Sequence, residues 1–277
     1  MLPSRRAVLA SLATLLAARA FAAERPRLAP DMQRIMDRGK LIVAITAADV
    51  PPFVITGADG KPAGHDIALA EGMARALGVP VAFDRSAGSA DAVIDMVARR
   101  DADLGLSRLS ETLDRAKRVR FSRPYLTLHR ALLLNRPRFA RLAQERDPVA
   151  VVKGLDAAIA VVGSSDRAAA QRLLPEARLR DYARWEPDAV DAVLKGAVAA
   201  AFGDELMVRR ALAAQPEAPL LLRSVILPET HDPIGVALPW DSLQLLAWVD
   251  LYLETAATPL DPDTLLATHG GGKRAPK

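Results

Sequence analysis

The chain has 277 residues, of which 51% are hydrophobic and 25% charged. This length and composition suit one large or two modest domains and exclude a disordered or fibrous chain. The net charge is +4, from 37 basic and 33 acidic residues, but three of the basic residues lie within residues 1–22, which hold no acid. Without them the balance is 34 against 33, so the rest of the chain has no basic excess for binding nucleic acid.

Residues 1–22 have the pattern of an export signal. Arg5 and Arg6 give a charged start, residues 7–18 are mostly apolar, and small residues at Ala20 and Ala22 predict cleavage near Ala22. The apolar stretch is too short to span a bilayer, and the twin-arginine resemblance does not decide the export route. Because the chain has no cysteine, disulfides, thiolate metal sites and a lipid anchor are excluded. We therefore expect a free periplasmic protein.

After the signal, strand-like and helix-like segments alternate along the chain, which predicts an α/β fold with mostly parallel sheets. Strands are predicted at 41–46, 79–83, 103–106, 125–135, 157–162, 179–182, 199–202 and 234–238. Helices are predicted at 66–77, 89–98, 165–174, 187–195, 204–214 and 240–255.

The long apolar strand at 125–135 separates two similar α/β series. A long strand that leaves one sheet is a natural route into a second domain. Two such lobes imply a cleft between them, where the carboxyl ends of strands hold ligands.

Several kinds of chemistry lack their sequence pattern. The four histidines are scattered, which favours structural or surface roles over metal ligation. The chain has no nucleophile elbow, no phosphate-binding loop and no dinucleotide fingerprint. We therefore expect neither a metal nor a cofactor.

Three segments at predicted strand ends have side chains suited to a small zwitterion. In the segment 107–115, Ser110 and Arg115 offer a hydroxyl and a guanidinium for a carboxylate. The alternative is that Arg115 merely pairs with Asp114 or Glu111 on a solvated face, and spacing alone favours this second interpretation.

The other two segments open helices. Ser164 and Ser165 follow Gly163 directly after a strand, so their backbone amides would form an anion site, or the segment would simply cap its helix. Asp204 would hold an ammonium or cap the helix that follows it, and capping is favoured from the residues alone.

Several short sequence blocks occur in a fixed order along the chain. They are Gly39 to Val43, Pro52-Phe53, Gly64 to Ile67 with Leu69-Ala70, Thr112 to Val119, Phe121 to Tyr125, Gly163 to Ser165, and Gly196 to Asp204. By the shared order and spacing of these blocks, the chain resembles the family 3 solute-binding proteins of ABC importers, the polar amino-acid-binding group, from about residue 39 to residue 268.

This resemblance implies a two-lobed periplasmic-binding-protein clamshell of type II, in which two hinge crossings join the lobes. The first lobe would comprise residues 40–134 and 232–270, and the second residues 135–231. By position, Arg115 and Ser110 would hold the α-carboxylate, Ser165 would add a donor, and Asp204 would take the α-ammonium. Opposite charges on opposite lobes would favour the closed state when a solute is bound.

The chain departs from the family pattern around the expected side-chain pocket. Val50 and Ala90 stand where relatives often have bulky or aromatic residues, His65 replaces an aromatic, and Ala68 replaces an aspartate. Arg108 occupies a position that is usually small. It would either form a salt bridge with Glu205 across the cleft or bind an extra anionic group on the ligand.

The resemblance implies a monomeric periplasmic protein that delivers an amino acid or related zwitterion to an inner-membrane ABC permease, without enzymatic activity. Two alternatives stay open. The same fold serves cyclohexadienyl dehydratases, in which Asp204 or Glu205 would be the acid. The clamshell would otherwise dock onto another periplasmic protein without transporting a solute.

Overall fold

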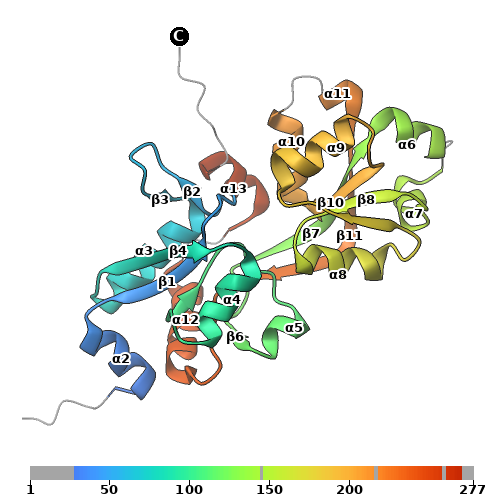
Figure 1. Cartoon of the computed structure of the whole chain (residues 1–277). Helices are drawn as coiled ribbons and strands as arrows, with labels where there is room; N and C mark the ends of the chain where they lie inside the picture. The colour runs from blue at the N-terminus through green and yellow to red at the C-terminus, as the bar shows by residue number, and fades with distance from the viewer. Residues whose placement is uncertain (1–27, 144–145, 215–217, 258–259, 270–277) are drawn as a thin grey trace, which may run out of the picture.

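The computed structural model describes residues 28–143, 146–214, 218–257 and 260–269 (Figure 1). The predicted export signal with its cleavage position, and the tail after residue 269, lie outside these residues. Within them the chain forms two five-stranded sheets and a small two-stranded one, with helices around the large sheets. This arrangement confirms the predicted α/β class.

The first large sheet has the strand order β4-β1-β5-β12-β6. β1 pairs in parallel with β4 and β5, whereas β12 is antiparallel to β5 and β6, so four strands share one direction. Its strands are β1 (Leu41–Thr46), β4 (Val81–Ala87), β5 (Leu104–Gly105), β6 (Val119–Phe121) and β12 (Ala237–Pro239). The same half, which we call the first lobe, contains α2 (Pro30–Arg38), α3 (His65–Leu77), α4 (Ala90–Ala98), α5 (Leu113–Ala116), α12 (Leu243–Thr255) and the hairpin of β2 (Ile55–Thr56) and β3 (Pro62–Ala63) (Figure 1).

The second large sheet has the order β11-β7-β10-β8-β9. β10, β8 and β9 are parallel, and β7 runs against both of its neighbours, β10 and β11. Its strands are β7 (Leu126–Asn135), β8 (Ala158–Val161), β9 (Arg178–Asp181), β10 (Ala200–Asp204) and β11 (Leu222–Ile234). This half, the second lobe, contains α6 (Arg136–Ala143), α7 (Pro148–Lys153), α8 (Ser164–Leu173), the turn η1 (Trp185–Ala189), α9 (Val190–Leu194), α10 (Glu205–Ala214) and α11 (Ala218–Leu221).

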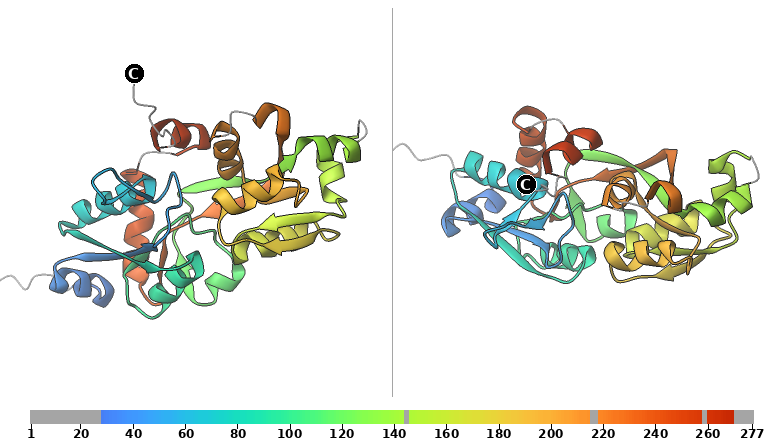
Figure 2. Two further views of the ribbon diagram at one scale, coloured as in Figure 1. Left: turned by 45° about the horizontal axis from the view of Figure 1, so that its top comes forward. Right: turned by 90° about the horizontal axis from the view of Figure 1, so that it is seen from above.

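Two long strands connect the lobes. β7 and β11 run side by side from the first lobe into the second (Figures 1 and 2). Next to their first-lobe end, Tyr125 N donates to Ile234 O at 3.0 Å, and Ser110 forms a bridge with Ile234. Both strands pair within the second sheet, although the predicted first lobe extends to residue 134.

Each sheet is packed on both faces, because successive residues of a strand point to opposite sides. On β1, Val43 belongs to one buried apolar cluster and its neighbour Ala44 to another. On β7, Leu132 and Leu133 are divided in the same way. This double burial explains why these strands are almost continuously apolar rather than alternating.

Two of the predicted helix boundaries follow directly from local residues. The Ser89 hydroxyl accepts a hydrogen bond from Ala92 N at the start of α4, as its N-cap position requires. α3 ends at Leu77 because Gly78 adopts the left-handed conformation, with φ of 73°.

The sequence prediction gave no element at α2, β2, β3, β6, α6, α7 and α11, and three further parts of the chain also differ from it. The thirteen-residue strand β11 was not predicted, since its segment mixes polar residues and prolines with apolar ones. The strand expected at 234–238 is divided, because β11 ends at Ile234 and β12 begins at Ala237. α13 (Pro262–His269) was also not predicted, and it lies against α10 of the second lobe (Figure 2).

A separate apolar cluster lies where the two lobes meet. It combines Phe53 of the first lobe and Leu206 of α10 with Leu265 of α13, around the first-lobe ends of β7 and β11. All three side chains are at most 1% exposed. We call this group, together with Leu126, Leu128 and Ile234, the hinge cluster.

Among the described residues, no helix is long and apolar enough to cross a membrane.

Candidate functional site

Charged side chains from both lobes meet beside the crossing strands. We call Arg108, Arg130, Asp166, Asp204 and Asp232 the junction network. Arg130, on β7, contacts two carboxylates, with Nη1 at 2.6 Å from Asp166 and Nη2 at 3.0 Å from Asp232. Its guanidinium also lies over the ring of Phe202, 5.9 Å from the centroid. Arg130 is only 5% exposed, so its partners replace the water it has lost.

Arg108 joins the network from the first lobe. It follows β5 at a turn in which Ser107 and Arg108 both have positive φ values, 147° and 51°. Its Nη1 donates to Oδ2 of Asp204, the last residue of β10 in the second lobe. The other oxygen of Asp204 accepts a hydrogen bond from Met207 N at 2.9 Å and so caps α10. Asp204 therefore caps α10, which is one of the two roles considered for it from sequence, and it pairs with Arg108 of the same chain, while its role toward a solute ammonium stays a prediction.

A second chain of contacts connects the predicted carboxylate-binding residues. Ser110 donates from Oγ to Asp232 at 3.1 Å, and its carbonyl accepts from Arg115 Nη1 at 2.9 Å. Arg115 Nε donates to Asp91 at 3.0 Å, and Asp91 also accepts from the hydroxyl of Ser164 in the second lobe. The sequence alternatives for the partner of Arg115, Asp114 and Glu111, are wrong, because Asp91 is brought beside it by α4.

The start of α8 supplies the remaining predicted residue. Gly163 is its N-cap and provides no side-chain hydrogen bond, so the first amides of the ten-residue helix depend on other acceptors. Ser165 lies in this first turn, and its hydroxyl makes no hydrogen bond to the described residues. Asp166 follows it and points into the junction network, where one of its oxygens, Oδ2, is buried without a partner among the described residues.

Burial controls the protonation of the network. Two arginines and three aspartates give it a net charge of −1 when all are ionised. Burial raises the pKa of Asp166, although Arg130 and Arg108 oppose this. Burial likewise raises the pKa of Asp232 to about 6, against the attraction of the same two arginines. Burial lowers the pKa of Arg108, but the three carboxylates outweigh it and the net pKa is raised, so the guanidinium stays charged.

Glu111 is a further, half-buried acid next to this region. Burial and the charge of Asp232 raise its pKa to about 6. Its Oε1 is buried without a partner among the described residues. It lies so close to Gly235 that a Cβ added there would be 2.6 Å from it.

The structure corrects the expected partner of Arg108. The sequence offered Glu205 or an anionic group of the ligand. The guanidinium reaches Asp204, so the pairing with Glu205 is wrong, and the contact with a ligand anion stays a prediction. Glu205 instead accepts from Arg209 Nη2 at 3.1 Å and from His129 N at 3.0 Å. Asp204 and Glu205 are adjacent, and β10 ends between them, so their side chains leave in different directions.

Sequence reasoning missed four residues of this region: Arg130, Asp166, Asp232 and Asp91. The sequence does mark Arg130, since it is the one arginine, lysine or acidic residue within the apolar run 126–135. A charge in a buried strand requires a partner. The partners themselves come from distant segments and carry no local signal.

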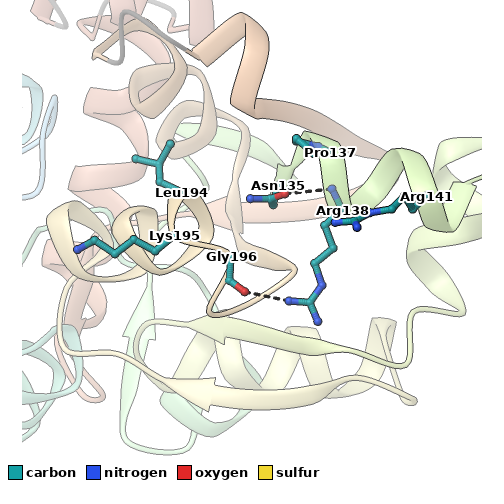
Figure 3. A pocket seen from close by; sticks show the side chains of 7 residues that line it. All are labelled: Asn135, Pro137, Arg138, Arg141, Leu194, Lys195 and Gly196. Atoms are coloured by element: carbon teal, nitrogen blue, oxygen red, sulfur yellow. Dashed lines mark hydrogen bonds between the residues drawn. The ribbon is translucent and has the colours of Figure 1, made fainter.

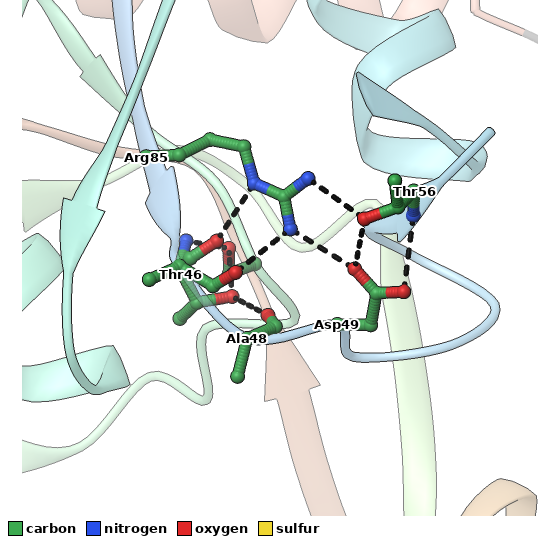
Figure 4. Close-up of polar contacts among 7 residues, drawn as sticks. Thr46, Ala48, Asp49, Thr56 and Arg85 are labelled. Carbon is green, nitrogen blue, oxygen red and sulfur yellow. Dashed lines mark hydrogen bonds and ion pairs between the residues drawn. The ribbon is translucent and has the colours of Figure 1, made fainter. Parts of the chain in front are cut away.

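An additional arginine fixes the loop that follows β1. Arg85 donates to Thr46 O at 3.3 Å, Ala47 O at 2.9 Å and Asp49 Oδ1 at 3.0 Å (Figure 4). Hydrogen bonds from Thr56 and Arg85 outweigh desolvation and lower the pKa of Asp49. This loop leads to Val50 and Phe53, so Arg85 positions the segment in which relatives were expected to have an aromatic residue.

One surface cavity lies away from the junction. It has a volume of about 510 Å³ and is lined by Asn135, Pro137, Arg138, Arg141, Leu194, Lys195 and Gly196 (Figure 3). Arg138 crosses it, donating from Nη1 to Gly196 O at 3.0 Å. None of the predicted site residues lines this cavity. Within the described ranges, no group of three or more metal-binding side chains is arranged to hold an ion.

A family model for bacterial extracellular solute-binding proteins, family 3, matches residues 42–257. The chain therefore belongs to this family, and the resemblance deduced from its motifs is confirmed.

Solved structures of amino-acid-binding proteins share the fold. An ancestral amino-acid-binding protein, a precursor of cyclohexadienyl dehydratase, is 28% identical with a TM-score of 0.69, covering 87% of this chain and 99% of its own. A substrate-binding protein of an amino acid ABC transporter from Streptococcus pneumoniae, bound to L-arginine, is 26% identical with a TM-score of 0.68, covering 85% and 96%. A variant of the arginine-binding protein ArgBP from T. maritima, at 22% identity and a TM-score of 0.67 over 87% of this chain and 99% of that one, shows the shared fold alone.

A curated relative is a larger protein. The membrane-bound lytic murein transglycosylase F of Maricaulis maris is 32% identical over 135 residues, which are 48% of this chain and 29% of that protein. The likeness thus concerns less than a third of the relative's length.

Proposed function

We propose that this protein is a periplasmic solute-binding protein that captures an amino acid or a related zwitterion and delivers it to an ABC importer in the inner membrane. The observation that carries the proposal is the meeting of Arg108 and Asp204 from opposite lobes, beside the strands that cross between them. A solute bound at this junction would contact both lobes, which is the condition for closure on binding.

The proposed roles of the side chains follow from their free donors and charges. Arg115 uses Nε and Nη1 within the chain, and Nη2, which has no hydrogen bond to the described residues, would donate to the solute carboxylate. Ser165, with Ser164 before it, would add hydroxyl and amide donors from α8. Asp204 would accept the solute ammonium, and Ser110 would orient Arg115 through its carbonyl.

Two relatives support the solute class. The Streptococcus pneumoniae protein is bound to L-arginine, and the ancestral protein is named as amino-acid-binding. We extend this solute class to the present chain. We also propose that it is a monomer, with a first lobe of residues 40–134 and 232–270 and a second lobe of residues 135–231.

The geometry favours binding over catalysis. An acid that assists the loss of water needs a carboxyl group free to exchange a proton with the substrate. Glu205 is engaged by Arg209 and His129, and Asp204, one oxygen of which caps α10, would be occupied by the solute ammonium. We therefore propose that the protein is not an enzyme.

Thermal shift with the twenty L-amino acids tests the proposal. At least one should raise the melting temperature, and Arg115→Gln and Asp204→Asn should each remove the shift, because each deletes one charge that the solute would contact. Arg118→Gln is the matched control, since Arg118 forms an exposed pair with Asp95. If Arg115→Gln and Asp204→Asn both keep the wild-type shift in melting temperature, the assignment of these two residues is refuted. Turnover of prephenate or arogenate by the purified protein would refute the non-enzymatic role.

A further inference from the structure

The turn that carries Arg108 is held rigidly. Both Ser107 and Arg108 have backbone conformations that side chains rarely adopt. Arg108 N donates to Asp66 Oδ2 at 2.8 Å, and the buried Asp66 is itself held by the hydroxyl of Tyr125 at 2.9 Å. The Ser107 hydroxyl accepts from Thr46 N at 2.9 Å. Such strain persists only where the surroundings enforce it, so the base of the Arg108 side chain has a fixed position facing the second lobe.

The Arg108 guanidinium takes the position of a ligand cation at Asp204. The Asp204 side chain is fully buried, with one oxygen on Met207 N and the other on Arg108. A carboxylate with both oxygens engaged has little remaining attraction for an ammonium. A solute cation can reach Asp204 with full effect only when Arg108 withdraws.

The contacts of Arg108 are also weaker than those of Arg130, its neighbour in the junction network. Arg130 holds two aspartates and stacks on an aromatic ring. Arg108 reaches one carboxylate through one nitrogen, and its Nε is buried without a partner among the described residues. A single contact between lobes can be exchanged for water when the lobes part. Loss of the Arg130 contacts would instead leave two carboxylates buried without a cation, one on α8 and one on β11.

We propose that Arg108 is an internal competitor of the solute: its guanidinium pairs with Asp204, holds the unliganded lobes together, and must be displaced by the solute's cationic group. The competition with a solute rests on the proposed function. The role of Arg108 in holding the unliganded lobes together does not depend on it. The fraction of molecules with the pair broken limits the apparent affinity. Arg108 therefore determines specificity, because it weakens the binding of any ligand that offers Asp204 only a poor cation.

Replacement of Arg108 by glycine gives a clean test. Arg108→Gly removes the guanidinium and also suits the left-handed φ at this position. Arg100→Gly is the matched control, because Arg100 likewise has a positive φ, 65°, and an ion pair, with Asp241, but within the first lobe. Asp204→Asn breaks the same interlobe pair from the other side, in case the glycine variant does not fold.

Two measurements use the chain without its predicted export signal, residues 1–22. Solution X-ray scattering without solute gives the radius of gyration, and calorimetry gives the dissociation constant for L-arginine. We expect Arg108→Gly and Asp204→Asn to be more expanded than the wild type and Arg100→Gly to be unchanged. We expect Arg108→Gly to bind L-arginine about tenfold more tightly than the wild type or Arg100→Gly.

The outcomes separate this inference from the proposed function. If Arg108→Gly and Asp204→Asn are as compact as the wild type, the interlobe role of Arg108 is refuted. If Arg108→Gly binds L-arginine no more tightly than a wild type that does bind it, the competition is refuted. If the variants are expanded but neither they nor the wild type bind any amino acid, the closing role stands and the amino-acid solute of the proposed function is refuted.

Discussion

Two sets of contacts join the lobes, and they differ in their chemistry. The hinge cluster is apolar and buried, and it gathers residues from the first lobe, the crossing strands, α10 and α13. Next to it, within the second lobe, Arg130 of the crossing strand β7 holds two aspartates, one on α8 and one on the other crossing strand, β11. The other set consists of single polar contacts across the junction, Arg108 with Asp204 and Ser164 with Asp91.

The difference separates a permanent connection from a reversible one. Apolar contacts and a doubly paired buried arginine lose much free energy when they are broken. Single polar contacts between the lobes lose less free energy, because water reaches both groups when the lobes part. The lobes can therefore change their separation about the hinge cluster while the crossing strands stay intact.

The largest effect should come from removing Arg130. Arg130→Met leaves Asp166 and Asp232 buried without their cation, and we expect a loss of about 3–5 kcal/mol in the free energy of unfolding. Arg108→Gly should lose only about 1 kcal/mol, since Asp204 regains water when the lobes part. Urea denaturation of both variants measures the difference. Equal losses would contradict the distinction between the two sets of contacts.

The next effect concerns the hinge cluster. Leu265 of α13 is fully buried there, and Leu265→Ala should reduce the free energy of unfolding by about 2–4 kcal/mol through the cavity it leaves. Leu220→Ala is the control, because Leu220 is 74% exposed and should cost less than about 0.5 kcal/mol. If both variants have wild-type stability in urea, α13 does not contribute to the connection between the lobes.

A pH-dependent effect should come from Glu111. Its pKa is raised to about 6 from an ordinary value of 4.5, so the folded chain binds the proton more tightly than the unfolded chain. The contribution of Glu111 to stability therefore falls as the pH rises from about 4.5 through about 6. Glu111→Gln stays neutral and should be about 1 kcal/mol more stable, relative to wild type, at pH 7.5 than at pH 4, a value reduced for its partial exposure.

The control for this titration is the exposed Glu71 of α3. Its side chain is 47% exposed on the surface of the first lobe, so Glu71→Gln makes the same substitution outside the region around Glu111. Thermal denaturation between pH 4 and pH 7.5 gives the comparison. A Glu111→Gln curve parallel to that of the wild type would show that Glu111 ionises without cost in the folded chain.

The smallest effect should come from the hydroxyl of Ser164. Ser164→Ala deletes its hydrogen bond to Asp91 across the lobes, and we expect a loss of about 0.5 kcal/mol with a small expansion in solution scattering. The exposed Ser224 provides the control variant, Ser224→Ala. A loss above about 2 kcal/mol would place Ser164 among the permanent contacts instead.

Much of the first sheet could be predicted from local patterns. The strand at 41–46 and the Ser89 cap were found from an apolar run and one hydroxyl, since both signals lie within a few residues. β11 was not predicted because its long polar segment is stabilised by pairing with β7. Such pairing requires no regular alternation of apolar and polar residues along the strand. α13 was not predicted because Leu265, its buried residue within the described part of the chain, packs against residues that are distant in the sequence.

For the candidate site, the sequence by itself identified the types of residue and the strand ends that present them. Ser110, Arg115, Ser164 and Asp204 lie in one region of the structure. Their roles toward a solute stay a prediction. The sequence also determined the alternation of strands and helices, because apolar spacing and caps act over short stretches of chain.

Only the tertiary structure decided which charges meet. Arg108 and Asp204 are 96 residues apart, and whether the arginine reaches Asp204 or its neighbour Glu205 depends on where β10 ends and how the lobes sit. Arg130 gained its two aspartates in the same way, from α8 and β11. The physical reason is that the energy of an ion pair depends on distance and burial in space, and neither is encoded by the separation of the two residues along the chain.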